Sequence, residues 1–216
     1  MSARVQVGAD SVSTLIDGAT NSKSLLVLGH GAGAGMDSDF MRTMAQALAA
    51  RGVLVWRFNF LYSELGRRAP DRQPVLESTF SAVLEAASEG FNGRILLGGK
   101  SLGARIASHL VAGGREVSGL VFLGYPLHPP GRPERMRDEH LYEIKAPMLF
   151  VEGTRDPFCP LPTLERVMAR LASPTLVVVE DGDHSLRVRK ASGRSTIDAW
   201  QEAADEVATW IENLPR

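Results

Sequence analysis

The chain has 216 residues, of which 44% are hydrophobic and 23% are charged. This length suits one well-buried core better than two, so we expect a single domain over residues 1–216. The 24 basic and 25 acidic side chains give a net charge of −1. That balance offers no electrostatic case for nucleic acid or an anionic membrane as the main partner.

Targeting and redox signals are sparse. The single cysteine, Cys159, excludes an internal disulfide, and we expect it to be a bystander in the chemistry. The first residues lack the apolar core of a signal peptide, and no window approaches the roughly 18 consecutive apolar residues of a membrane span. We therefore expect a cytoplasmic protein.

Two alternating runs, residues 4–7 and 12–17, predict an antiparallel hairpin at the start of the chain. After it, continuous apolar runs alternate with amphipathic helical patterns, and a long polar connection covers residues 61–73. The further predicted strands are residues 24–28, 53–58, 94–97, 119–123, 148–151 and 175–179. The predicted helices are residues 39–51, 74–89, 102–112, 161–171 and 196–213. This order predicts an α/β fold whose mostly parallel, eight-stranded sheet is covered by helices on both faces.

The first candidate for chemistry is Ser101, in the Gly-x-Ser-x-Gly pattern of residues 99–103. The pattern is weak alone, but here a buried strand precedes it and a helix follows, as in a nucleophile elbow. We expect a side chain at either flanking glycine to collide with the neighbouring strand or with the turn. A phosphate-binding loop would need glycine at position 94, where the chain has Arg94. A helix-capping role for Ser101 stays open.

A serine hydroxyl needs a base that accepts its proton. In an elbow-type hydrolase the chain order is serine, acid, histidine, and three histidines follow Ser101: His128, His140 and His184. Of these, only His184 follows a strand and has an acid before it at another strand end. His184 is therefore the predicted base.

Asp156, just beyond the strand of residues 148–151, is the predicted acid that orients His184. Asp181 and Asp183 compete for that role. They are so near His184 in the sequence that we expect them to shape its loop instead.

The glycine-rich segment of residues 29–35 follows the first parallel strand. Its backbone N–H groups, together with that of Leu102, are candidates to bind an oxyanion. We expect the loop donor at Ala32, with Gly33 as the second choice. His30 is expected to brace this loop.

At these residues the chain resembles the α/β-hydrolase superfamily. More narrowly, it resembles a small branch with a testis-expressed hydrolase-like protein and a domain of a nuclear lysine-acetyltransferase complex subunit (the KANSL type). The similar segments are residues 29–33, 57–60, 99–103, 124–131, 153–156 and 183–185. The resemblance spans about residues 24–210 and implies an α/β-hydrolase sheet with a triad of Ser101, Asp156 and His184. It implies no particular substrate.

Substrate specificity in this fold usually comes from an inserted cap. Only residues 125–147 are available here, which is too short for a cap domain and predicts an open, shallow site. We expect Tyr125, His128 and Pro129 to form part of its floor or rim.

Other side chains leave two interpretations open. Met36, Phe158 and Leu161 are candidates for an apolar acyl wall, or they are ordinary packing. Basic residues near the expected rim could favour an acidic substrate, or they are solvated or paired with carboxylates. These basic residues are Arg57, Arg67, Arg68, Arg72, Lys100 and Arg155.

The leading hypothesis is a serine hydrolase that cleaves a small-molecule carboxylic ester or thioester through an acyl-enzyme. The alternative is a non-catalytic binding or scaffold module on the same fold. No spacing typical of a metal site or a dinucleotide-binding unit occurs, so we expect no metal and no cofactor. The sequence carries no signal for an oligomeric state.

Overall fold

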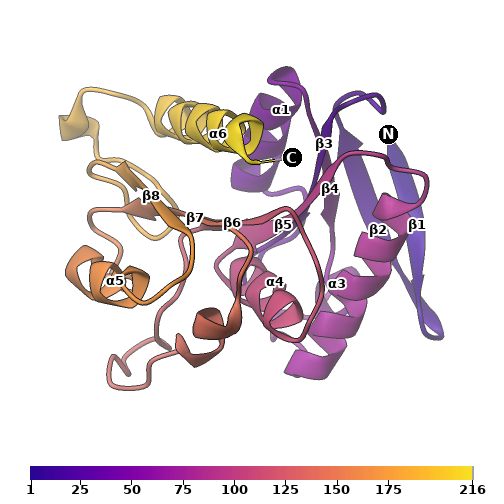
Figure 1. Cartoon of the computed structure of the whole chain (residues 1–216), viewed down its shortest axis with the longest axis horizontal. Helices are drawn as coiled ribbons and strands as arrows, with labels where there is room; N and C mark the ends of the chain where they lie inside the picture. The colour runs from indigo at the N-terminus through magenta and orange to yellow at the C-terminus, as the bar shows by residue number, and fades with distance from the viewer. Residues whose placement is uncertain (216) are drawn as a thin grey trace.

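The computed structural model describes residues 1–215 and is built around one eight-stranded sheet (Figure 1). Its strand order is β1-β2-β4-β3-β5-β6-β7-β8. β2 pairs antiparallel with β1 and β4, and all other pairs are parallel. The strands are β1 Ser2–Val7, β2 Asp10–Asp17, β3 Ser24–Gly29, β4 Val53–Phe58, β5 Arg94–Lys100, β6 Gly119–Leu123, β7 Met148–Gly153 and β8 Pro174–Val179. The predicted fold class is confirmed.

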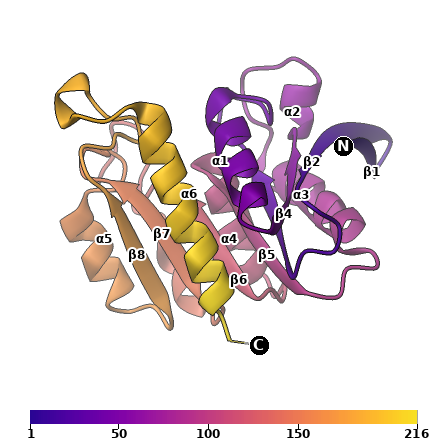
Figure 2. The same cartoon turned by 90° about the horizontal axis from the view of Figure 1, so that it is seen from above.

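Helices cover both faces of the sheet (Figures 1 and 2). The α-helices are α1 Asp39–Ala50, α2 Leu61–Glu64, α3 Gln73–Ser88, α4 Leu102–Ala112, α5 Leu161–Met168 and α6 Thr196–Asn213. Two 3₁₀ helices, η1 and η2, span Glu139–Glu143 and Lys190–Ser192. α1 and α6 pack on one face, and α3, α4 and α5 pack on the other.

The buried central strand β3 shows why the sequence folds into these layers. All six of its residues are buried, as expected of a continuous apolar run. Because side chains alternate along a strand, Leu25 and Val27 join the core under α3, α4 and α5. Leu26 and Leu28 join the core under α1 and α6. One strand therefore supports both hydrophobic cores.

Some element bounds differ from the prediction. β5 continues three residues beyond Leu97, because Gly98 and Gly99 lie in register with β6 and β3. A Cβ atom on Gly98 would lie 2.4 Å from the Val121 carbonyl oxygen, so glycine here permits close strand packing. The polar connection contains the short helix α2, and the stretch of residues 125–147 contains η1.

The six strands β3 to β8 run parallel, so the segments that follow them meet at one edge of the sheet. In open α/β sheets, ligands bind at this carboxyl edge. None of the helices formed by residues 1–215 is long and apolar enough to cross a membrane.

Candidate active site

Ser101 occupies a strained turn between β5 and α4. Its φ of 51° and ψ of −102° are rare for a residue other than glycine. A Cβ atom on Gly103 would lie 2.1 Å from the Gly29 carbonyl oxygen, and one on Gly99 would lie 2.4 Å from the Gly103 carbonyl carbon. The Ser101 N–H donates to the Leu123 carbonyl over 3.2 Å. The turn therefore holds α4 against β3 at a distance that admits only glycine.

The side chains of Ser101, His184 and Asp156 form one hydrogen-bonded chain. His184 Nε2 lies 2.9 Å from Ser101 Oγ, and His184 Nδ1 lies 2.7 Å from Asp156 Oδ2. The other carboxylate oxygen of Asp156 accepts the Phe158 N–H over 2.8 Å. Because a carboxylate only accepts, His184 carries its proton on Nδ1, and its Nε2 is left to accept the serine proton.

Asp156 and His184 differ in the exposed fraction of their side chains. The Asp156 side chain is fully buried, whereas 20% of the His184 side chain is exposed. Asp156 is held from both sides, and His184 lies at the boundary with solvent. The acid is therefore fixed in place, and the imidazole remains accessible to a substrate.

The competing acids shape the His184 loop. Asp183 Oδ1 accepts the Ser185 and Arg187 N–H groups over 2.7 and 2.9 Å. Asp181 Oδ2 accepts the Arg189 N–H over 2.8 Å, and its side chain is ion-paired with the same arginine. Both carboxylates close turns of this loop, and neither hydrogen bonds to the imidazole.

The expected oxyanion donors differ in their position. Within residues 1–215, neither the Ala32 nor the Leu102 N–H donates to another backbone group. Both residues line a hollow that also contains Ser101. Gly33, with a φ of 71°, lies outside the hollows around Ser101. Ala32 and Leu102 therefore lie beside Ser101, and their N–H groups stay the predicted oxyanion donors.

His30 braces the glycine-rich loop from beneath. Its Nε2 accepts the Phe60 N–H over 3.1 Å, and its Nδ1–H donates to the Gly31 carbonyl over 2.8 Å. Burial lowers the pKa of the His30 imidazole, which favours this neutral form. The ring thus ties the loop after β3 to the segment after β4.

Two buried ionisable groups lie near Asp156: Lys100, which the sequence analysis expected at the rim, and Glu152, which it did not single out. Burial lowers the pKa of Lys100 to about 8, although Asp156 and Glu152 oppose this shift. Burial and the Asp156 charge raise the pKa of Glu152 well above its usual range. Glu152 Oε1 accepts the Tyr125 N–H over 2.5 Å, and its Oε2 has no partner within residues 1–215. The available signal for Glu152 was a carboxylate directly after the predicted apolar strand of residues 148–151, which β7 extends to Gly153.

Cys159 lies beside this buried group. Its side chain is fully buried, and burial together with Glu152 and Asp156 raises the pKa of the thiol. A thiol is a nucleophile only as a thiolate, so this environment favours an inert cysteine. Among residues 1–215, no group of three or more His, Cys, Asp or Glu side chains is arranged to hold a metal ion.

Two hollows adjoin the Ser101 hydroxyl. They share the walls formed by Ala32, Ser101, Phe158 and His184. The first hollow measures about 280 Å³, and the segment of residues 126–137 contributes one of its walls. The second measures about 640 Å³ and is bounded by the loop after β3 and the His184 loop. Although residues 125–147 are too few for a cap domain, they do enclose one side of the site.

Two of the expected substrate-binding residues line the first hollow. The Phe158 ring meets the His184 ring edge to face, with centroids 4.7 Å apart. The His128 ring also lines this hollow, and its Nδ1–H donates to the Pro129 carbonyl over 3.0 Å. Phe158 thus packs against the imidazole and borders the space where a substrate would lie.

Tyr125, Met36 and Leu161 line neither hollow, which corrects the expectation for the site floor and acyl wall. Tyr125 is fully buried, because its ring packs against the core aromatics Phe122 and Phe150. Met36 is held through its backbone, whose carbonyl accepts a hydrogen bond from Arg57 over 2.6 Å. Leu161 begins α5, away from the hollows.

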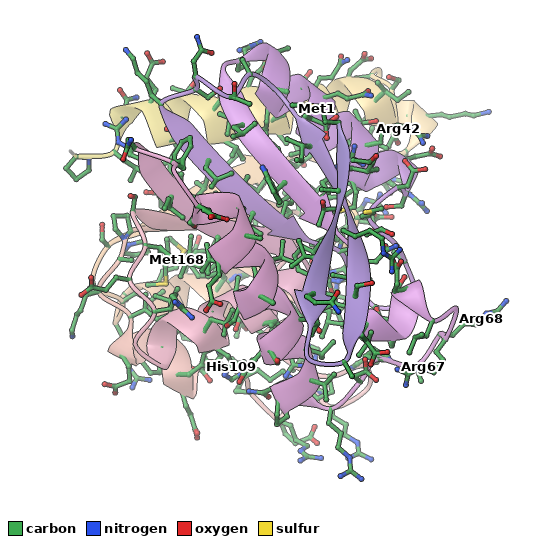
Figure 3. All side chains as sticks on the ribbon, turned by 90° about the vertical axis from the view of Figure 1, so that its right-hand side faces the viewer. Met1, Arg42, Arg67, Arg68, His109 and Met168 are labelled. Carbon is green, nitrogen blue, oxygen red and sulfur yellow. The ribbon has the colours of Figure 1, made fainter. Side chains whose placement is uncertain are left out.

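Most of the basic residues expected at the rim form ion pairs or lie at the periphery of the molecule. Three of them are ion-paired with aspartates: Arg57, Arg67 and Arg155. Figure 3 shows Arg67 and Arg68 at the periphery of the molecule, on the loop that follows α2. The arginines that do line the first hollow are Arg105 and Arg137, which the sequence analysis did not single out.

Comparison with known proteins places this geometry in a family. The model of a family described as an alpha/beta hydrolase domain matches residues 22–212. A dienelactone hydrolase from Anabaena variabilis has a TM-score of 0.79 and 17% identity, with coverage of 100% of this chain and 98% of that one. A serine hydrolase without a lid from Xanthomonas campestris has a TM-score of 0.75 and 19% identity, with coverage of 100% and 95%. Est1E from Butyrivibrio proteoclasticus has a TM-score of 0.73 and 15% identity, with coverage of 95% and 96%. These three structures share the fold, and the family match shows that the chain belongs to the alpha/beta hydrolase domain family.

Proposed function

We propose that the protein is a serine hydrolase that cleaves carboxylic esters or thioesters through an acyl-enzyme intermediate. The observation that carries this proposal is the chain of short contacts from Ser101 through His184 to Asp156, at 2.9 and 2.7 Å. A helix-capping serine has no need of a base and an acid in line with its hydroxyl. Similar structures named as serine hydrolases and esterases also support hydrolysis.

In acylation, Ser101 Oγ attacks the ester carbonyl carbon while its proton passes to His184 Nε2. The carbonyl oxygen becomes an oxyanion, which accepts hydrogen bonds from the Ala32 and Leu102 N–H groups. Asp156 stabilises the imidazolium that forms. The intermediate then expels the alcohol or thiol, which takes the proton from His184, and the acyl group stays on Ser101.

Deacylation repeats these steps with water. His184 removes a proton from a water molecule as it attacks the acyl carbon, and the oxyanion is bound at the same N–H groups. Collapse of the intermediate releases the carboxylic acid and returns the proton to Ser101. Each partial reaction uses the same three side chains, and neither needs a cofactor.

A panel of 4-nitrophenyl esters with acyl chains of rising length tests this proposal. We expect hydrolysis by the wild-type protein and a loss of at least 10³-fold in kcat/KM for Ser101→Ala. Ser185→Ala is a matched control, because Ser185 lines the second hollow beside His184 but its hydroxyl does not contact the imidazole. Equal activity of Ser101→Ala and wild type would contradict the proposal. A folded wild type without activity would favour a non-catalytic binding module.

A further inference from the structure

Two arginines line the first hollow beside the Ser101 hydroxyl. Arg105 lies on α4, and its backbone N–H donates to the Ser101 carbonyl over 3.1 Å. It is therefore one helical turn, about 6 Å along the axis, from the residue at position 101. Arg137 lies in the segment between β6 and η1, so β6 separates it from α4 in the sequence.

Neither guanidinium group has a partner. Across residues 1–215, no hydrogen bond or ion pair forms to the side chain of Arg105 or Arg137. Both side chains are only partly exposed. Partly buried guanidinium groups are normally paired with carboxylates, as the buried Arg57 is paired with Asp17 in this same protein.

The two charges also act on each other. Burial and the nearby Arg105 charge lower the pKa of the Arg137 guanidinium. Two like charges that share one hollow repel, and each leaves several N–H donors unused. A planar carboxylate placed between them would accept from both and relieve the repulsion.

We propose that the substrate acyl chain ends in a carboxylate, which Arg105 and Arg137 bind inside the first hollow. This inference rests on the proposed function, because it takes Ser101 as the nucleophile. Apolar residues that also line the hollow, including Leu76 and Phe158, would contact the methylene groups of such a chain. The substrate class is thus esters or thioesters of short dicarboxylic acids, with one carboxyl group left free.

The remaining charged group of this wall is consistent with the inference. Asp71 also lines the hollow, but its Oδ1 lies 2.8 Å from Arg67, which offsets its charge. Its Oδ2 is buried and has no partner within residues 1–215. The net charge that faces the hollow therefore stays positive, and we expect the carboxylate to lie at the arginines and away from Asp71.

Charge preference in hydrolysis tests the inference. The probes are mono-4-nitrophenyl adipate and the neutral 4-nitrophenyl methyl adipate, which differ mainly in the free carboxylate. We expect wild type to prefer the acidic ester by at least tenfold in kcat/KM. Arg105→Gln and Arg137→Gln should each lower that preference about 10- to 100-fold, the range of a hydrogen bond to a charged group. Arg→Lys at either position should retain part of it.

Arg135→Gln is the matched control, because Arg135 is exposed in the same segment and does not line the first hollow. It should leave the preference as in wild type. A wild type that prefers the neutral ester would overturn the inference. Gln variants that lose activity equally toward both esters would overturn it too, since that result indicates a structural role.

Binding to Ser101→Ala provides a readout without catalysis. Calorimetry should detect adipate and show at least tenfold weaker binding of the neutral adipamide, and Arg137→Gln in that background should remove the difference. Equal binding of the two ligands would refute the inference. Hydrolysis of esters without a charge preference refutes only the carboxylate site. Adipate binding that depends on the arginines, in a wild type that cleaves no ester, refutes only the proposed function.

Discussion

Replacing Asp156 by asparagine separates the role of its charge from the role of its shape. The two carboxylate oxygens accept from two different donors, the Phe158 N–H at 2.8 Å and His184 Nδ1 at 2.7 Å. Asparagine offers only one oxygen. If that oxygen stays on the Phe158 N–H, the amide NH₂ faces His184 Nδ1 and forces the proton onto Nε2. An Nε2–H donates to the Ser101 hydroxyl and cannot accept its proton.

The expected loss follows from this change of tautomer. We predict a fall of about 10³- to 10⁴-fold in kcat/KM at pH 7, which corresponds to about 4–5.5 kcal/mol in the activation free energy. The free energy of unfolding should change by no more than about 1–2 kcal/mol, because one hydrogen bond is altered and no cavity forms. Hydrolysis of 4-nitrophenyl butyrate gives the first value, and urea unfolding gives the second.

Two matched variants make the experiment specific. Asp183→Asn should retain activity within about threefold, because a single Asp183 oxygen accepts both of its hydrogen bonds and asparagine can keep them. Glu152→Gln should also retain activity, since the raised pKa of Glu152 already favours its neutral form. Near-normal activity of Asp156→Asn combined with a large loss in either other variant would refute the assignment of Asp156.

Three further predictions concern stability, each measured by urea unfolding. Gly103→Ala places a Cβ atom 2.1 Å from a carbonyl oxygen and should lower the free energy of unfolding by about 2–4 kcal/mol. Gly113→Ala, whose nearest contact is 3.3 Å away, should lower it by less than about 1 kcal/mol. Equal losses would contradict the close-packed turn. Arg57→Ala breaks a buried ion pair and should lower the free energy of unfolding by about 3–5 kcal/mol. Arg67→Ala removes a half-exposed arginine and should lower it by less than about 1 kcal/mol. The reverse order would count against this account. Burial lowers the pKa of His140 to about 4, so the unfolded chain binds a proton first and stability should fall as the pH drops from about 6.5 to 4. After a discount for its partial exposure, we expect about 1 kcal/mol from this group, and His140→Gln should flatten the pH profile accordingly; an unchanged profile would refute the assignment.

The mostly parallel sheet, and the meeting of the three candidate side chains at its edge, were predictable from the sequence for one physical reason. Parallel strands bring their carboxyl ends to one edge, so Ser101, Asp156 and His184 had to meet if each follows such a strand. The strand β5 was predicted too short, because glycine is generally rare in strands. Here Gly98 instead allows close packing of β5 against β6.

The walls of the site were harder to predict. Arg105 was not singled out, although it follows Ser101 by four residues and helical spacing puts it one turn away. Arg137 lies in a segment without periodicity, and only the folded chain places it in the same hollow. Tyr125 was misplaced because a sequence does not show whether an aromatic residue just beyond a strand packs into the core or faces the site.

Labelling with a fluorophosphonate probe tests the central claim, that Ser101 is an activated nucleophile, most directly. The probe reacts with a serine only where a base removes its proton, and mass spectrometry of peptides identifies the labelled residue. We predict one label on Ser101 in the wild type and in Ser185→Ala, and none in Ser101→Ala or His184→Ala. A folded wild type that stays unlabelled, or a label that persists in Ser101→Ala, would contradict the account.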